Sequence, residues 1–279
     1  MEVYEDKSKN IFIRAKEIRI SQNVSFGENI RIHLKGTLEI GSHSRLGSNT
    51  EILANDVVIG KHLFNSSGLR IGGGGRQNPN ANFQIGDRCT IHNNFINVCE
   101  PVVIGDDVGL SPETSILTHG YWLSVLDGYP ATFSGVKIGN GVIVGYRSLI
   151  MMGVHIADGS VVGAQSLVSK SIKEKGIYAG SPARFIKEIK PLSKDEKRSK
   201  ANEIIKSYIP IAEYHEIENP HEKITLNYPI LKFMNFSVNL ETFSYEGEEN
   251  EETDDLRDFL RKYGIRIYTE RPFKSKFSF

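Results

Sequence analysis

The sequence predicts an all-β solenoid of short stacked strands, followed by a smaller α+β unit. The first observation is an aliphatic residue at every sixth position: Ile138, Val144, Ile150, Ile156, Val162 and Val168. The second is a small or β-branched residue four positions after each of these: Val142, Ser148, Val154, Ser160, Ser166 and Ile172. The third is a change of composition near residue 190, where the repeat stops. A period of six suits neither a helix nor an ordinary strand, whereas short strands joined by turns of constant length produce it.

The solenoid is expected to begin early and to extend over residues 1–190. A looser form of the same repeat starts near residue 18 and shifts register twice. Its inward positions are predicted to be Ile20, Phe26, Ile32, Ile40, Leu46, Ile52, Val58, Ile85, Ile91, Ile104, Leu110 and Ile116.

Two segments interrupt the repeat and are predicted to be loops, at about residues 61–84 and 119–135. The first is rich in glycine, asparagine and proline, which favour turns. It contains the run Gly72 to Gly75, but no GK[ST] follows, so flexibility explains this run better than phosphate binding.

Residues 191–279 are predicted to form the α+β unit and to cover the carboxyl end of the solenoid. Ser193 and Glu196 resemble a capping box, which predicts a helix to about Tyr208. Further along, the predicted elements are a strand on Phe236, Val238 and Leu240, a helix capped by Thr253 with Leu256, Phe259, Leu260 and Tyr263 on one face and ended by Gly264, and a last strand in RIYTE.

Composition argues against several classes of function. Thirty-four basic and thirty-four acidic residues give no net charge, which removes the broad attraction expected of a nucleic-acid binder. Cys89 and Cys99 are the only cysteines and form no ligand cluster, so neither a disulfide framework nor a metal site is expected. The amino terminus lacks an apolar signal region and no run is long enough to cross a bilayer, which favours a cytoplasmic protein without membrane insertion.

The segments IGDRCTIHNN, VVIGDDVGLSPETSILTHG and VKIGNGVIVGYRSLI, with the later run GIYAGSPARFIKEI, resemble the hexapeptide-repeat acyltransferases. Within that family the likeness is to the sugar and polysaccharide O-acetyltransferase branch. The resemblance covers residues 85–190 strongly and the earlier coils weakly. It implies a left-handed parallel β-helix, a handedness that spacing does not reveal and that is rare among parallel crossovers. It also implies acetyl-coenzyme A as acyl donor, a sugar or glycan acceptor, and a homotrimer with the donor cleft between neighbouring solenoids.

His119 is the residue that the resemblance identifies as the general base. It ends a coil in ILTHG, immediately before the second loop. A hydroxyl is a poor nucleophile, and an imidazole with an ordinary pKa near 6.5 takes its proton during attack, a contribution of about 10²–10⁴ in rate. Asn93 and Asn94 align with an acceptor-binding asparagine of the family, although asparagines in solenoids equally often form hydrogen-bonded ladders at turns. On the acceptor side, Glu113 is a candidate to orient the imidazole.

The later coils are expected to bind the donor. The amide of Gly145 or its neighbour is the candidate oxyanion donor. By resemblance, the remaining donor-site residues are Tyr146 and Ala164 at the pantetheine arm, then Ser169 and Lys170, with Arg184 and Lys187 near the nucleotide phosphates. Many relatives have tryptophan where this chain has Ile143, so packing near the thioester is expected to differ.

The function predicted is therefore acetyl-coenzyme A dependent O-acetylation of a sugar hydroxyl, in cell-surface polysaccharide or glycan biosynthesis. An N-acetyltransferase for a nucleotide-linked amino sugar remains the main alternative. A γ-class carbonic anhydrase would need a close histidine pair as zinc ligands, yet no histidine lies between His119 and His155. A noncatalytic scaffold would explain the hexads, but not their combination with THG, a loop and SPAR.

Overall fold

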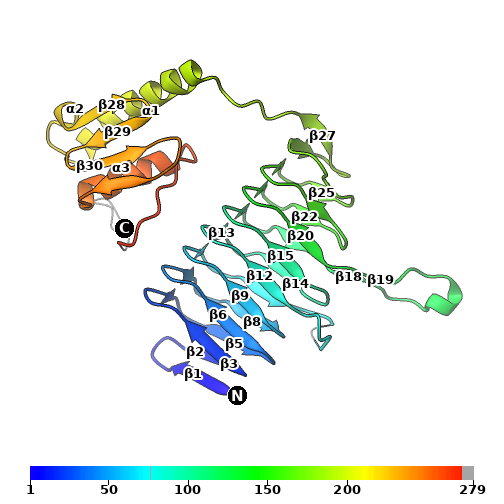
Figure 1. Cartoon of the computed structure of the whole chain (residues 1–279). Coiled ribbons are helices and arrows are strands. Elements are labelled where there is room, and N and C mark those ends of the chain that lie inside the picture. The colour runs from blue at the N-terminus through cyan, green and yellow to red at the C-terminus, as the bar shows by residue number, and fades with distance from the viewer. Residues whose placement is uncertain (76, 272–279) are drawn as a thin grey trace. The chain divides into compact units, whose positions relative to one another are not determined.

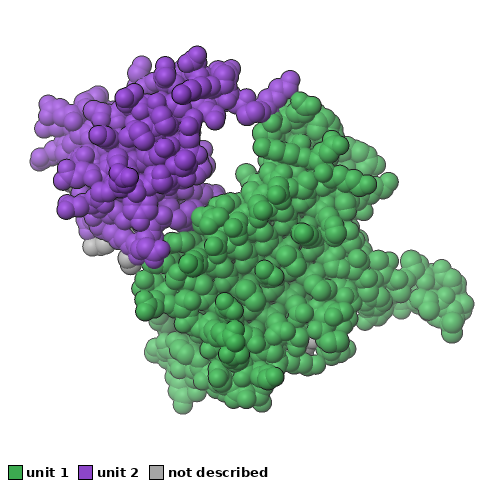
Figure 2. Space-filling view, in the orientation of Figure 1, with its two compact units in different colours: residues 1–189 green, residues 190–279 purple. Residues whose placement is uncertain are grey.

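The computed structural model describes residues 1–75 and 77–271 (Figure 1). The chain divides into two compact units, residues 1–189 and residues 190–279, which are coloured separately in Figure 2. The first unit is a parallel β-solenoid of about eight turns. In most turns the chain adds one strand to each of three sheets in the order A, B, C, and equivalent strands of neighbouring turns pair in parallel. The first and last strands, Glu2–Asp6 and Arg184–Lys187, instead pair antiparallel with the strand next to them in the chain.

The strands of the solenoid are short. Sheet A contains, in spatial order, β1 Glu2–Asp6, β2 Ile11–Ala15, β5 Ile30–Leu34, β8 Glu51–Ala54, β11 Arg70–Gly72, β14 Phe95–Asn97, β17 Ser115–Ile116, β22 Leu149–Ile150 and β25 Leu167–Val168. Sheet B contains β23 His155–Ile156, β20 Val136–Ile138, β15 Val102–Ile104, β12 Phe83–Ile85, β9 Val57–Ile59, β6 Thr37–Ile40 and β3 Glu17–Ile20. Sheet C contains β27 Arg184–Lys187, β26 Ile177–Ala179, β24 Val161–Val162, β21 Ile143–Val144, β16 Gly109–Leu110, β13 Thr90–Ile91, β10 Phe64–Asn65, β7 Arg45–Leu46 and β4 Ser25–Phe26.

The hexad residues from Ile138 to Val168 line the interior of the solenoid, as the period predicts, and each is at most 3% exposed. The second series is buried too, and its first five members lie immediately before strands β21 to β25. Its hydroxyls are satisfied within the coils: Ser148 Oγ, for example, donates to the Gly163 carbonyl oxygen at 2.9 Å. Stacking therefore gives one continuous apolar core with polar groups at its edges.

Two predictions about the early coils are wrong in detail. Val58 does not point inward: its neighbours Val57 and Ile59 are buried, because β9 pairs with β6 so that Val58 lies opposite Glu39. One residue of slip moves a strand side chain to the other face. Nor is the whole of 61–84 a loop, since β10 and β11 lie within it and β12 begins at Phe83. Of the described residues in this range, only those between β11 and β12 leave the coil.

A hairpin leaves the solenoid where the second loop is predicted. Strand β18, His119–Gly120, pairs antiparallel with β19, Thr132–Phe133, and the 3₁₀ turn η1, Val125–Asp127, lies between them. The hairpin projects from the side of the coils (Figure 1). It departs from the corner between sheets A and B, called here the A–B corner. The corner between sheets C and A is called the C–A corner.

The second unit joins two longer helices and a short one to a four-stranded antiparallel sheet. Its elements are α1 Lys194–Tyr214, α2 Pro220–Lys223, β28 Ile224–Asn227, β29 Ile230–Phe233, β30 Phe236–Asn239, β31 Tyr245–Gly247 and α3 Glu251–Arg261. The capping box of Ser193 and Glu196 is confirmed. Helix α3 begins earlier than predicted, because Asn250 is its cap and Thr253 is the third helical residue. Residues 266–270 form no strand. No helix among the described residues is long and apolar enough to span a membrane.

Candidate functional site

His119 is half-buried at the first position of β18, where the chain passes from the A–B corner into the hairpin. Its imidazole lies against two rings of that hairpin: the ring centroids are 5.4 Å from Tyr121 and 6.1 Å from Phe133. The rings of Tyr121 and Phe133 also stack on each other at 5.4 Å. The imidazole therefore lies between the coils of the solenoid and the aromatic rings of Tyr121 and Phe133.

Asn97 is the polar partner of His119, a role that was not predicted from the sequence. It ends β14, one turn before His119, because β14 pairs with β17 through Ile96 and Ile116. Asn97 Oδ1 is 2.7 Å from His119 Nδ1, and the same oxygen accepts from Thr118 Oγ1 at 2.7 Å. The side chain is almost fully buried. Asn97 directly follows the buried Ile96, which occupies the same inward position as Ile116 in the next turn. This spacing could have placed Asn97 at the corner where His119 lies.

The glycine run also belongs to the site. Asn97 Nδ2 donates to the carbonyl oxygens of Gly72 and Gly74, each at 3.0 Å. A β-carbon on Gly74 would lie 3.2 Å from His119 Nε2, so the segment passes beside the atom that Asn97 does not engage. Gly73 has a φ of 90°, which favours glycine. The sequence of this run indicated flexibility, whereas the structure places the run against the imidazole.

Asn93 and Asn94 lie at the other end of β14, at the C–A corner, away from His119. Asn94 is buried, and its Nδ2 donates to the Ser111 carbonyl oxygen at 2.8 Å, which matches the ladder alternative. Asn93 is exposed, and its Oδ1 accepts from the Glu113 amide at 3.3 Å. The structure does not bring these two asparagines to the base.

Glu113 does not orient His119. Its carboxylate accepts from Arg147 Nε at 2.5 Å and from the Tyr146 hydroxyl at 3.1 Å, at the C–A corner. The hydrogen bond from Arg147, the larger cause, and that from Tyr146 lower the pKa of the carboxyl group. The expectation of a carboxylate partner for the imidazole is therefore wrong, and an amide takes that place.

The predicted donor-site residues fall into two groups. Gly145, Tyr146 and Ala164 lie at the C–A corners of consecutive turns, before β22 and β25, whereas Ser169 and Lys170 follow β25 at the A–B corner. Within one chain these groups are at opposite ends of the sheet A strands. The Gly145 amide already donates to the Val162 carbonyl oxygen at 2.8 Å, so of the two predicted oxyanion donors the amide of its neighbour remains the candidate.

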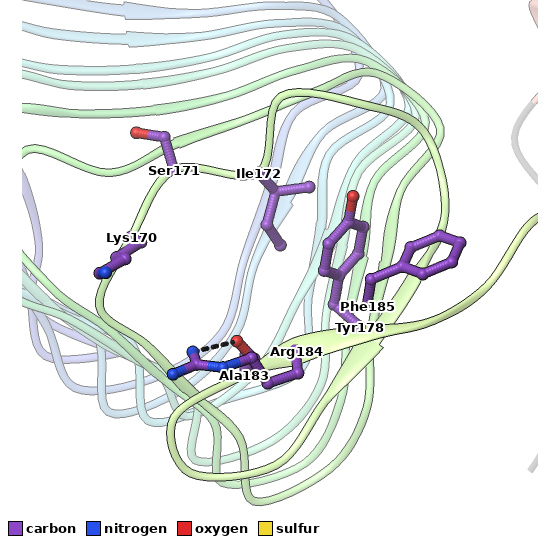
Figure 3. A pocket seen from close by; sticks show the side chains of 7 residues that line it. All are labelled: Lys170, Ser171, Ile172, Tyr178, Ala183, Arg184 and Phe185. Carbon is purple, nitrogen blue, oxygen red and sulfur yellow. Dashed lines mark hydrogen bonds between the residues drawn. The ribbon is translucent and has the colours of Figure 1, made fainter.

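A pocket of about 380 Å³ lies at the last turn of the solenoid (Figure 3). Its lining residues are Lys170, Ser171, Ile172, Tyr178, Ala183, Arg184 and Phe185. Lys170 and Arg184 lie toward one side, and the rings of Tyr178 and Phe185 lie at the other, in edge-to-face contact at 5.5 Å (Figure 3). The pocket thus contains Arg184, one of the two predicted phosphate ligands, together with Lys170, which was predicted only as a donor-site residue. Lys187, the other predicted phosphate ligand, is exposed farther along β27 and does not line the pocket. Two cations beside two rings suit an anionic aromatic ligand.

No candidate metal centre occurs in the described part of the chain: no group of three or more His, Cys, Asp or Glu side chains is placed to hold an ion. Both cysteines are buried, and burial raises the pKa of each thiol, that of Cys89 to about 12.

Neither a protein-family model nor a curated protein matches this sequence. Among solved structures, the chain is similar to a hexapeptide-repeat acetyltransferase of Vibrio cholerae, with 18% identity over 63% of this chain and 73% of that one and a TM-score of 0.35. It is similar to a polysialic acid O-acetyltransferase, with 23% identity, coverage of 67% and 94%, and a TM-score of 0.44. It is also similar to an N-acyltransferase of Bacillus cereus in complex with dTDP and coenzyme A, with 21% identity, coverage of 74% and 98%, and a TM-score of 0.42. At these values the likeness is one of fold alone.

Proposed function

We propose that this chain transfers the acetyl group of acetyl-coenzyme A to a sugar hydroxyl, with His119 as the general base. The observation that carries the proposal is the imidazole at the A–B corner, bound through Nδ1 to Asn97 and presenting Nε2 beside Gly74. A general base needs an orienting partner on one nitrogen and an approach to the other. The sequence resemblance in THG, the clean coils and SPAR supports the same chemistry.

The reaction proceeds by direct transfer. The acceptor oxygen attacks the thioester carbonyl carbon while His119 Nε2 takes the hydroxyl proton. The tetrahedral intermediate then collapses, the carbon–sulfur bond breaks, and the imidazolium returns its proton to the departing thiolate. The products are an acetylated sugar and the free thiol of coenzyme A. Proton removal by a positioned base contributes about 10²–10⁴ to such a rate.

Two features beside the base favour a sugar as the acceptor. Tyr121 and Phe133 are 54% and 50% exposed and stack on each other, which offers a flat apolar surface for one face of a pyranose ring. Between residues 120 and 134 the only charged side chain is that of Asp127. A neutral aromatic surface suits a neutral glycan, in agreement with a role in cell-surface polysaccharide or glycan biosynthesis.

The pocket at the last turn supports acetyl-coenzyme A as the donor. Lys170 and Arg184 would bind its phosphates, and Tyr178 and Phe185 would contact its adenine. Gly145, Tyr146 and Ala164 lie at the other corner, so we propose that a homotrimer brings the C–A corner of one copy to the A–B corner of the next. Mass measurement in solution tests the trimer, and a monomer that remains fully active would contradict it.

The activity is tested by release of coenzyme A thiol with two acceptor panels, plain glycosides or oligosaccharides and nucleotide-linked amino sugars. His119→Ala should keep the melting temperature and lose about 10²–10⁴-fold in kcat on a hydroxyl acceptor. His155→Ala is the matched control, because that histidine is exposed on sheet B. Wild-type kinetics of His119→Ala would refute the assignment, and activity confined to the amino sugars would replace O-acetylation by N-acetylation.

A further inference from the structure

We propose that Asn97 is the positioning residue of this site: its single amide group holds the neutral His119 as the tautomer protonated on Nδ1 and fastens the glycine segment 72–75 beside Nε2. The catalytic part of this inference rests on the proposed function. Its structural part, the tautomer, can be measured without any turnover.

The orientation of the Asn97 amide follows from its partners. Its nitrogen carries two N–H groups, and each meets a backbone carbonyl, at Gly72 and at Gly74, both at 3.0 Å. Its oxygen faces donors, the Thr118 hydroxyl at 2.7 Å and the Thr118 amide at 3.3 Å. A flipped amide would set nitrogen against an N–H and oxygen against two carbonyls, so only the observed orientation satisfies all these buried groups.

The tautomer of His119 follows in turn. Asn97 Oδ1 can only accept a hydrogen bond, so His119 Nδ1, at 2.7 Å, must be the donor. A neutral imidazole then carries its lone pair on Nε2, the nitrogen beside Gly74. The opposite tautomer would place two lone pairs in contact across 2.7 Å.

An asparagine performs both tasks, whereas a carboxylate performs one. An aspartate at this position would accept from Nδ1, but it has no N–H for the carbonyls of Gly72 and Gly74. Its charge would also favour the imidazolium form over the neutral base. The amide thus orients the base and holds the adjacent backbone while adding no charge in a side chain that is 2% exposed.

Three other titratable groups lie near the imidazole. Tyr121 is in ring contact with it, and Cys99 and Glu100 follow Asn97 at the same corner. Burial raises the pKa of the Cys99 thiol, which therefore stays neutral. The Glu100 carboxylate is engaged by the side-chain amides of Asn78 and Asn80, at 2.9 and 3.4 Å.

The first experiment measures the tautomer in the wild-type protein. Imidazole nitrogen-15 shifts are recorded above neutral pH, and the His119 signals are assigned by their loss in His119→Gln. We expect protonated Nδ1 and unprotonated Nε2. Protonated Nε2 would overturn the inference even if transfer activity is found. The expected tautomer in a protein without transfer activity would leave the positioning intact and refute the proposed function.

The second experiment separates positioning from folding. Asn97→Ala should lower kcat by about 10²-fold or more at every pH. Asn97→Asp should shift the acid limb of the kcat/KM profile by about one pH unit or more to higher pH, because the carboxylate stabilises the imidazolium. At pH values above that limb, Asn97→Asp should be more active than Asn97→Ala. If Asn97→Ala fails to fold, the Asn97→Asp profile and the tautomer still decide.

Asn65→Asp is the matched control. Asn65 is fully buried in an earlier coil, accepts from the Gly47 amide at 2.9 Å and donates to the His92 carbonyl oxygen at 3.0 Å. Asn65 is far in sequence from His119, so Asn65→Asp should lower the stability of the fold without shifting the pH profile of kcat/KM. An acid limb that does not move in Asn97→Asp, or one that moves equally in Asn65→Asp, would overturn the inference.

Discussion

Substitution of Gly74 by alanine should remove most acceptor turnover while leaving the fold intact. The new β-carbon would lie 3.2 Å from His119 Nε2 and 3.4 Å from Cε1. An acceptor oxygen must itself come within about 2.6–3.2 Å of that nitrogen, so the methyl group occupies its place. Since the general base contributes about 10²–10⁴ in rate, kcat/KM for the acceptor should fall by about 10²-fold or more.

The backbone should tolerate the change, because the φ of Gly74 lies outside the left-handed region. The assay is thiol release from acetyl-coenzyme A, with acceptor and donor varied separately and the melting temperature recorded. Gly109→Ala is the control, since a β-carbon there meets no heavy atom within 4 Å. If Gly74→Ala turned over like wild type, the acceptor would not approach Nε2 past this segment and the arrangement proposed for the base would be refuted.

Three further outcomes are expected. Arg184→Ala should raise the KM for acetyl-coenzyme A more than it lowers kcat in steady-state assays, and an unchanged donor KM would remove Arg184 from phosphate binding. Burial raises the pKa of the Cys89 thiol to about 12, so the reactive thiolate is scarce near neutral pH. Iodoacetamide should therefore not label Cys89 in the native protein at that pH. Rapid labelling of Cys89, measured by mass spectrometry, would contradict this. Ile150→Ala, at a fully buried position, should lower the free energy of unfolding by about 2–5 kcal/mol in denaturant titrations. Ile186→Ala, at a position that is 58% exposed, should change it by about 0.5 kcal/mol or less, and equal effects would refute the burial argument.

Much of the solenoid could be predicted because its order is local. A constant spacing of six residues repeats the same strand and turn, so the inward positions from Ile138 to Val168 follow from counting alone. The prediction fails where the spacing slips, as at Val58, because alternation along a strand makes each slip of one residue exchange the two faces. Helix α1 was predictable for a similar reason, since its capping box is a contact between Ser193 and Glu196.

The same distinction between local order and long-range contacts applies to the candidate site. The sequence by itself determined that His119 stands where regular coils end and an excursion begins. Only the tertiary structure decided what surrounds it, because pairing of β14 with β17 joins Asn97 to His119 across 22 residues, and the same amide draws in Gly74 from 23 residues before Asn97. Such neighbours depend on the register between turns, which the insertions in this chain shift. Period determines which side chains are buried, whereas register determines which polar groups meet.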